Sequence, residues 1–261
     1  MRRRCGWAKR LCASSGWAET MPLRRMTGRE RSEAANWQLA ALLAFNAGAV
    51  DVTGYLGLRQ FTSHMSGTVA TLAAEFATKG YTILLGPAVV LACFVAGAAF
   101  CAVVVNWERR RNRESLFAVP VAVEALLLAA VALLGGPGHL VASLAVMGFS
   151  MGLQNAVITK ISDAEIRTTH VTGTITDIGI ELGRLFYWNR TPRGTEVRAD
   201  RRKLALLTLL VVLFFGGGTL SAVTFQRLGF LLMLPLAAML AAITVLPIAA
   251  DFNAGRVRSN A

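Results

Sequence analysis

The sequence carries little charge for its length. Only 16% of its 261 residues are Asp, Glu, Lys or Arg, against about a quarter in soluble domains. Charge is almost absent from long apolar blocks at 81–105, 116–134, 204–225 and 228–249, where Glu124 is the single charged residue. Each block approaches or exceeds the roughly 18–20 apolar residues that cross a hydrocarbon core about 30 Å thick. The scarcity of charge therefore argues against a soluble globular domain and predicts an integral membrane protein.

Cysteines and catalytic motifs are also scarce. The chain has four cysteines, and Cys5, Cys12, Cys93 and Cys101 suggest neither a disulfide framework nor a metal-ligand set. No nucleophile elbow or phosphate-binding glycine loop is present. We therefore expect no enzymatic activity, no cofactor and no metal. A membrane-embedded enzyme ranks third among the alternatives, because two histidines from separate segments are a weak metal signal.

Basic residues are the exception to this scarcity, and they give a formal net charge of +12. Nearly all of them lie between or outside the apolar blocks, as the positive-inside rule requires. No connecting loop is long enough for a nucleic-acid-binding domain, so we expect no nucleic-acid partner. The first 36 residues contain nine Lys or Arg, and Met21 and Met26 leave open a later start of translation.

The apolar pattern predicts three regions. Residues 1–36 form a basic cytoplasmic tail, 37–251 the transmembrane domain and 252–261 a cytoplasmic C-terminal tail. Within the transmembrane domain we distinguish a first repeat, 37–134, and a second repeat, 139–250. Eight segments are expected, at 37–58, 64–78, 81–105, 116–134, 139–158, 168–185, 204–225 and 228–249.

The most informative feature is an internal repeat of polar residues. His, Gly, Thr and Glu recur at the same spacing in two stretches, one from His64 to Glu75 and one from His170 to Glu181. Chance similarity between apolar stretches is common, but shared polar residues at one spacing are not. The repeat therefore indicates that the two short segments, 64–78 and 168–185, play corresponding roles.

The distribution of charge favours short segments that enter and leave the membrane on one side. With a cytoplasmic N-terminus, that arrangement places 24 of the 27 Lys and Arg inside and leaves only Arg59, Lys79 and Arg227 outside. A helix of about 14 residues also spans only roughly 21 Å. We predict an all-α fold of six transmembrane helices and two half-helices, in an inverted repeat because each half crosses three times. Eight short tilted spans are the alternative.

Polar residues at the two half-helices form a candidate binding site. Ser, Thr and Gly are favoured where helices begin, and in a bilayer the first N–H groups must be capped locally or bind something. Two such helix starts facing the midplane would suit an anion or another polar solute. The residues expected to line this site are Asp51, His64, Ser66, Thr68, Asn155, His170, Thr172, Thr174 and Asp177.

Each of these residues also has a structural interpretation. Clusters of Ser, Thr and Gly in membrane helices commonly serve close packing, which is how we interpret Gly148–Gly152 and Gly216–Gly218. For His64 and His170, helix capping and solute contact remain open alternatives. Glu124, alone in a strong span, is suited to a hydrogen bond with a neighbouring helix while protonated.

Four stretches resemble the YoaK-like family of bacterial transmembrane proteins of unknown function. They begin at Ala49, Ser63, Gly152 and Arg167, and the last, Arg167–Arg184, is the most specific. The resemblance implies a membrane location but no substrate or reaction. Thr68 stands where the family commonly has Asn after the first Ser/Thr-Gly pair.

The leading hypothesis is a small secondary transporter or permease of a bacterial inner membrane, with both termini cytoplasmic. Its partners would be the lipid bilayer and a small polar or anionic solute, and homo-oligomerisation is left open. The alternative is a non-transporting scaffold or sensor whose basic loops, chiefly 184–203 with seven Lys or Arg, contact lipid or a partner protein.

Overall fold

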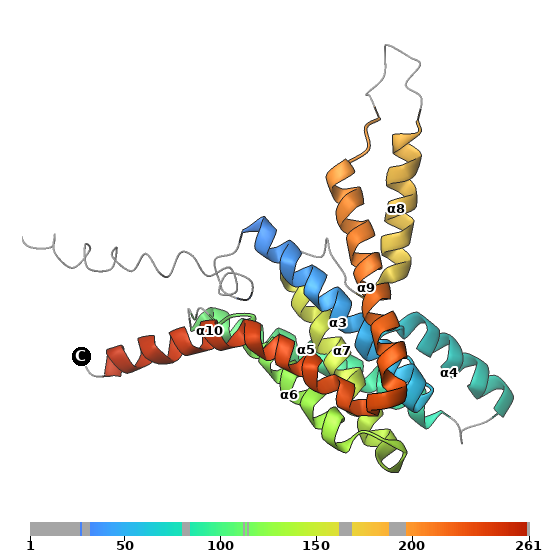
Figure 1. Ribbon diagram of the computed structural model, residues 1–261, viewed down its shortest axis with the longest axis horizontal. Coiled ribbons are helices and arrows are strands. Elements are labelled where there is room, and N and C mark those ends of the chain that lie inside the picture. Colours follow the sequence, from blue (N-terminus) through green and yellow to red (C-terminus); the bar gives the residue numbers. More distant parts are fainter. Residues whose placement is uncertain are drawn as a thin grey trace, which may run out of the picture.

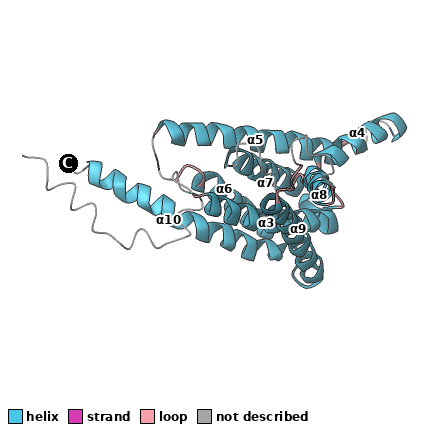
Figure 2. Ribbon diagram, turned by 90° about the horizontal axis from the view of Figure 1, so that it is seen from above, coloured by secondary structure: helices cyan, strands magenta, loops and turns pink. Residues whose placement is uncertain are grey.

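The computed structural model describes residues 27, 32–79, 84–111, 113, 115–161, 169–187 and 197–259. Within these residues all regular structure is helical (Figure 2). The long helices are α3 Glu33–Leu58, α5 Leu85–Arg110, α6 Ala118–Leu134, α7 Leu140–Ile161, α9 Arg201–Leu228 and α10 Met233–Ser259. The short elements are α4 Met65–Lys79, α8 Val171–Leu185 and the 3-10 turns η2 Pro137–His139 and η3 Gly229–Leu232.

The helices coincide closely with the eight expected segments, and the ends show the largest differences. α3 begins four residues before the expected start at Trp37, because Ser32 caps it by accepting a hydrogen bond from the Ala35 N–H. α10 continues to Ser259, well past the expected end at Ala249. The proposed N-terminal tail, 1–36, therefore includes the first turn of α3, and most of it lies outside the described residues.

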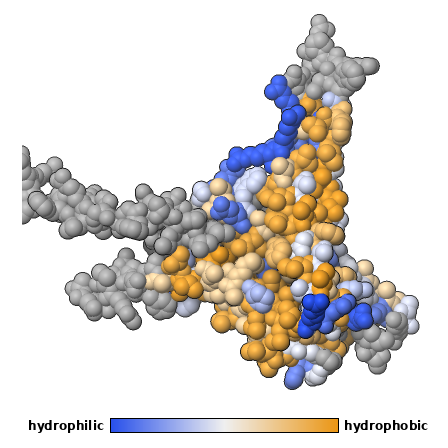
Figure 3. All heavy atoms as spheres, in the orientation of Figure 1, coloured by the Kyte–Doolittle hydropathy of each residue, from blue (hydrophilic) through white to orange (hydrophobic). Residues whose placement is uncertain are grey.

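Apolar side chains cover the outside of the molecule as well as its core. Four helical stretches are long and apolar enough to cross a membrane: Glu33–Leu58, Leu85–Arg110, Leu140–Ile161 and Arg201–Ala249. The last contains α9 and most of α10, and α6 is a shorter apolar helix. Much of the described surface on the face seen in Figure 3 is hydrophobic, and Leu126, Val103 and Phe215 are each about two-thirds or more exposed. Helices that are apolar all round belong in a membrane, so this is an all-α membrane protein.

The long helices associate in pairs. α3 packs along α9, α5 along α7, and α6 along α10. Figure 1 shows α6 beside α10 and α8 beside α9, whereas α4 projects away from the bundle. The short helices therefore pack mainly through one neighbour each, α4 on α5 and α8 on α9.

The α3–α9 contact depends on a Phe-x-x-Gly sequence in each helix. A Cβ atom added to Gly48 would clash with the carbonyl oxygen of Phe214, and one added to Gly217 would clash with that of Phe45. Each glycine thus allows close approach of the partner helix backbone. The closest point is the Phe carbonyl of the partner's own Phe-x-x-Gly sequence. Small residues at helix crossings are the main device for tight packing in membranes.

The α5–α7 contact has the same reciprocal form. A Cβ atom at Gly97 would clash with the Phe149 carbonyl oxygen, and one at Gly152 with the Phe94 carbonyl oxygen. All four helices therefore carry Phe-x-x-Gly at their crossing. Gly148, one turn before Gly152, is also in close contact with the backbone of α5 at Val90. The packing role expected for the glycines of α7 is seen here.

A proline in α10 creates the contact that holds Thr27. Pro247 has no N–H, which leaves the Ile243 carbonyl without its usual helical donor. The buried Thr27 hydroxyl donates to that carbonyl at 3.1 Å, and the Thr27 carbonyl accepts from the Phe117 N–H at 3.2 Å. Thr27 therefore joins the start of α6 to α10.

The glycine triplet in α9 offers a direct test of the helix crossing. We expect Gly217→Ala to lower stability by about 1–3 kcal/mol, because the added methyl must push the α3 backbone away. Gly216→Ala is the matched control, since a Cβ there meets nothing within 4 Å and alanine favours the helix. Thermal unfolding in detergent measures both, and equal melting temperatures for the two variants would contradict the packing argument.

Candidate functional site

The short helices α4 and α8 begin in the same way. The Thr68 hydroxyl donates to the His64 carbonyl at 3.1 Å, and the Thr174 hydroxyl donates to the His170 carbonyl at 3.2 Å. The backbone N–H groups of both threonines reach the same carbonyls. Both hydroxyls therefore bond within their own helix, as Ser and Thr often do four residues after a carbonyl. Their hydrogen bonds stabilise the first turn of each short helix and do not reach another segment.

After α3 ends, the chain folds back beside this helix before α4 begins. One carboxylate oxygen of Asp51, Oδ1, accepts the backbone N–H groups of Thr62 and Ser63, each at 2.8 Å. Asp51 lies seven residues before Leu58, the end of α3, so the loop folds back by about 10 Å at 1.5 Å per residue. These bonds satisfy N–H groups just ahead of α4. Asp51 is thus an anchor for the start of the short helix.

The second half has a corresponding return along α7. Asn155 lies six residues before Ile161, the end of α7, and its Oδ1 accepts the Thr169 hydroxyl at 2.5 Å. The Asn155 Nδ2 donates to the Met151 carbonyl at 3.1 Å, which fixes the orientation of the amide. Asp51 and Asn155 therefore both hold the loop that leads into a short helix.

The two imidazoles are placed differently. His64 Nδ1 lies 3.0 Å from Asp51 Oδ2, with the histidine side chain 39% exposed and the aspartate 1% exposed. Its ring also meets Phe61 edge-on at a centroid distance of 4.9 Å. His170 instead lies against its own helix, because a Cβ added to Gly173 would clash with its Nδ1. One imidazole is therefore tied to α3, and the other covers the first turn of α8.

Both histidine motifs line one cavity of about 800 Å³. The loop before α4, the start of α8, and the helices α5 and α7 all contribute to its wall. Its polar lining residues are Ser63, His64, Ser66, Asn155, Thr159, Thr169, His170, Thr172 and Thr176, and its apolar ones are Met65, Phe94, Val171 and Ile175. Among the described residues that line it there is no Asp or Glu.

The structure brings together five of the nine expected site residues. His64, Ser66, Asn155, His170 and Thr172 line the cavity. The other four do not: Asp51 lies behind His64, and Thr68 and Thr174 bond within their helices. Asp177 is about half exposed and lies 3.9 Å from Lys203 at the start of α9.

Four hydroxyl residues of the lining were missed by the sequence argument. Ser63 and Thr169 each directly precede a histidine, so the repeat itself could have identified them. Thr176 follows Thr172 by one helical turn and shares its face. Thr159 lies on α7 one turn after Asn155, and its hydroxyl donates to the Asn155 carbonyl at 2.8 Å.

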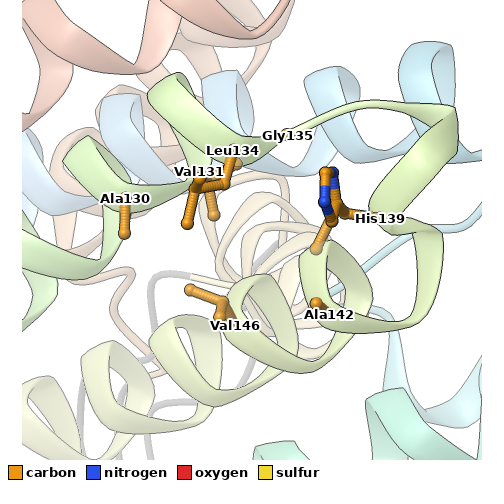
Figure 4. A pocket seen from close by; sticks show the side chains of 8 residues that line it. Ala130, Val131, Leu134, Gly135, His139, Ala142 and Val146 are labelled. Atoms are coloured by element: carbon orange, nitrogen blue, oxygen red, sulfur yellow. The ribbon is translucent and has the colours of Figure 1, made fainter.

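A second, smaller cavity of about 80 Å³ lies between the end of α6 and the start of α7 (Figure 4). Ala130, Val131, Leu134 and Val146 form most of its wall, and His139 stands at one side. The cavity is small and almost wholly apolar, so it resembles a packing gap between helices. No group of three or more His, Cys, Asp or Glu able to hold a metal ion occurs in the described parts of the chain.

Two bacterial transmembrane proteins are similar to the chain. It is 28% identical to UPF0700 transmembrane protein YoaK of Bacillus subtilis (strain 168) over 191 residues, which cover 70% of this chain and 81% of that protein. It is also 28% identical to UPF0700 transmembrane protein RA0705 of Rhizobium meliloti (strain 1021) over 177 residues, which cover 68% and 73%. No solved structure matches the chain significantly.

The family described as "Protein of unknown function (DUF1275)" matches residues 39–246. The match includes both histidine motifs, the four Phe-x-x-Gly sequences and all residues that line the larger cavity. It agrees with the resemblance to YoaK-like proteins and with the apolar helices. The chain belongs to the DUF1275 family of membrane proteins.

Proposed function

We propose that the protein is a small secondary transporter for a small anionic solute, which binds in the cavity between the two histidine motifs. The observation that carries this proposal is that His64 and His170, 106 positions apart in the sequence, line the same cavity. A volume of about 800 Å³ is within the range of small-molecule sites, roughly 300–1,000 Å³.

The chemistry of the lining favours an anion. Hydroxyl, amide and imidazole groups can all donate hydrogen bonds, and α4 and α8 both begin at the cavity wall. Helix N-termini carry partial positive charge and attract anions. Ser63 adds an independent indication, because its buried hydroxyl has no hydrogen-bond partner and the residue lines the cavity. The nearby Asp51 carboxylate is already engaged by two N–H groups and His64.

An inverted repeat would provide a mechanism by which the cavity opens alternately to the two sides of the membrane. With α4 matched to α8, the order of the helices pairs α3 with α7 and α5 with α9. The α3–α9 and α5–α7 contacts then correspond, and both use reciprocal Phe-x-x-Gly contacts. Transporters built from inverted repeats bind solute between the halves, near interrupted helices, and alternate by rocking one half against the other. α4 and α8 would be the re-entrant half-helices, and the six long helices would be the full crossings.

The histidines provide the test of solute binding. In liposomes on a solid-supported membrane, we expect jumps of sodium phosphate, sulfate or acetate against gluconate to give currents for at least one anion. His64→Gln and His170→Gln should each raise the half-saturating concentration about tenfold or more, since a hydrogen bond to a charged group contributes about 1.5–3 kcal/mol. His139→Gln is the matched control, because the third histidine lies outside the larger cavity.

Currents unaffected by either substitution would place the solute elsewhere. If no anion gave a current and a stoichiometric protein partner co-purified, the scaffold or sensor alternative would be favoured. The basic residues that begin α9, Arg201, Arg202 and Lys203, are the exposed surface such a partner would use.

The re-entrant path of α4 makes a separate prediction. In a variant without native cysteines, Gln60→Cys precedes α4 and Thr78→Cys lies in its last turn, whereas Arg111→Cys follows α5. We expect a membrane-impermeant maleimide to label positions 60 and 78 from the periplasmic side and position 111 from the cytoplasmic side. Labelling of 60 and 78 from opposite sides would mean that α4 crosses the membrane fully and would refute the re-entrant arrangement.

A further inference from the structure

A second polar cluster lies in the core, among α3, α6 and α7. Glu124 on α6 is fully buried, and its Oε1 accepts from Asn46 Nδ2 at 3.0 Å. The same Asn46 nitrogen donates to Gln154 Oε1 at 2.8 Å, and Gln154 Nε2 donates to the Leu43 carbonyl at 2.8 Å. Asn46 and Gln154 are also fully buried. We call Asn46, Glu124 and Gln154 the core triad.

The triad is incompletely bonded. Glu124 Oε2 and Asn46 Oδ1 have no hydrogen-bond partner, and neither does the buried hydroxyl of Ser150, one turn before Gln154. Within the described residues, no Lys, Arg or His forms an ion pair with Glu124. The Glu124 carboxyl group is therefore hydrogen-bonded to a neutral amide. A buried carboxylate would need a cation as its partner.

The other titratable groups nearby do not supply that cation. α3 adds Asp51, which is bound by its own loop. α5 adds the buried thiol of Cys101, and α7 adds Lys160 in its last turn, which forms no ion pair with Glu124 within the described residues. On α10 the described titratable residue is Asp251, which accepts the Ser115 N–H at the end of the bundle.

Burial without a cation selects the protonated form of the carboxyl. An isolated carboxylate in a low-dielectric interior is far more costly than a neutral acid, which is why such groups take up a proton. The neutral acid also supplies a hydroxyl donor, and Asn46 Oδ1 is a buried acceptor that lacks one. A metal cation fits less well, because hard cations take roughly six or more oxygen ligands and most backbone carbonyls here are used within helices.

We propose that Glu124 is the proton-binding site of the transporter, so that the proton is its coupling ion. This inference rests on the proposed function. Glu124 holds a proton in the closed arrangement of α3, α6 and α7, and releases it when their contact opens and water reaches the carboxyl. Intramembrane acids of this kind commonly mark proton pathways. On release the proton is transferred to a water molecule and Glu124 becomes a carboxylate, so no other reactant is needed.

Infrared spectroscopy tests this proposal without any transport. In liposomes at neutral pH, the full chain should show the C=O stretch of a buried protonated carboxylic acid. Glu124→Gln should remove this band, whereas Glu33→Gln, at a largely exposed carboxylate, should leave it unchanged. A wild-type spectrum without the band, or a band retained in Glu124→Gln, would overturn the proposal. So would loss of the band on adding sodium, which would make the site a metal-cation site.

Melting temperatures distinguish the loss of a proton-binding site from misfolding of the variant. Glutamine resembles the neutral acid in shape, so Glu124→Gln should keep the melting temperature within a few degrees. Glu124→Ala leaves a cavity and removes one of the two acceptors of Asn46 Nδ2, so it should lower that temperature by about 5–10 °C. If glutamine were as damaging as alanine, the carboxylate form would be required and the proposal would fail.

The coupling of anion transport to a proton gradient provides the last test. If the wild type carries an anion, a proton gradient should drive its accumulation, and Glu124→Gln should abolish that accumulation while retaining anion exchange without a gradient. Proton-driven accumulation that persists in Glu124→Gln would refute the role of Glu124. An absence of any wild-type anion transport would instead refute the proposed function, while the infrared result would still decide whether Glu124 binds a proton.

Discussion

A membrane offers no water to backbone groups, so each N–H and C=O in it needs a partner within the protein. If α4 and α8 are re-entrant, as we propose, their starts are where this constraint is hardest to meet, because the first N–H groups of a helix have no helical acceptor. Ahead of α4, Asp51 accepts two backbone N–H groups from the returning loop. Ahead of α8, Asn155 binds the loop through the Thr169 hydroxyl. These two anchors position the histidine motifs, and the cavity follows from them.

The same backbone arrangement carries different chemistry in the two halves. Asp51 is an acid and Asn155 is its uncharged counterpart, so only His64 has a carboxylate beside it. His170 rests on Gly173 instead. If an inverted repeat relates the halves, they have kept their packing contacts and diverged at the cavity. Such a difference places a carboxylate behind the imidazole on one side of the cavity only.

The sequence predicted the helices well because hydropathy and length determine them directly. The eight expected segments correspond to eight long or short α-helices, and Ser63 and Thr169 extend the repeat that had been recognised. The reciprocal use of Phe-x-x-Gly could not be foreseen, since it depends on which helices pair. Thr68 and Thr174 were expected at the site because of their residue type, but a threonine four residues after a carbonyl can bond within its own helix. The six crossings and their inverted arrangement remain predictions.

The core triad and the cavity are joined by the same two helices. α3 carries Asn46 for the triad and, five residues later, Asp51 for the loop before α4. α7 carries Gln154 for the triad and, at the next position, Asn155 for the cavity. Because helices move as rigid units, a shift of α3 against α7 must alter both sites together. The Asn46–Gln154 hydrogen bond joins α3 to α7 directly, and Glu124 accepts from the same Asn46 nitrogen. A change in the protonation of Glu124 would therefore alter the contact between the two helices that also position the solute cavity.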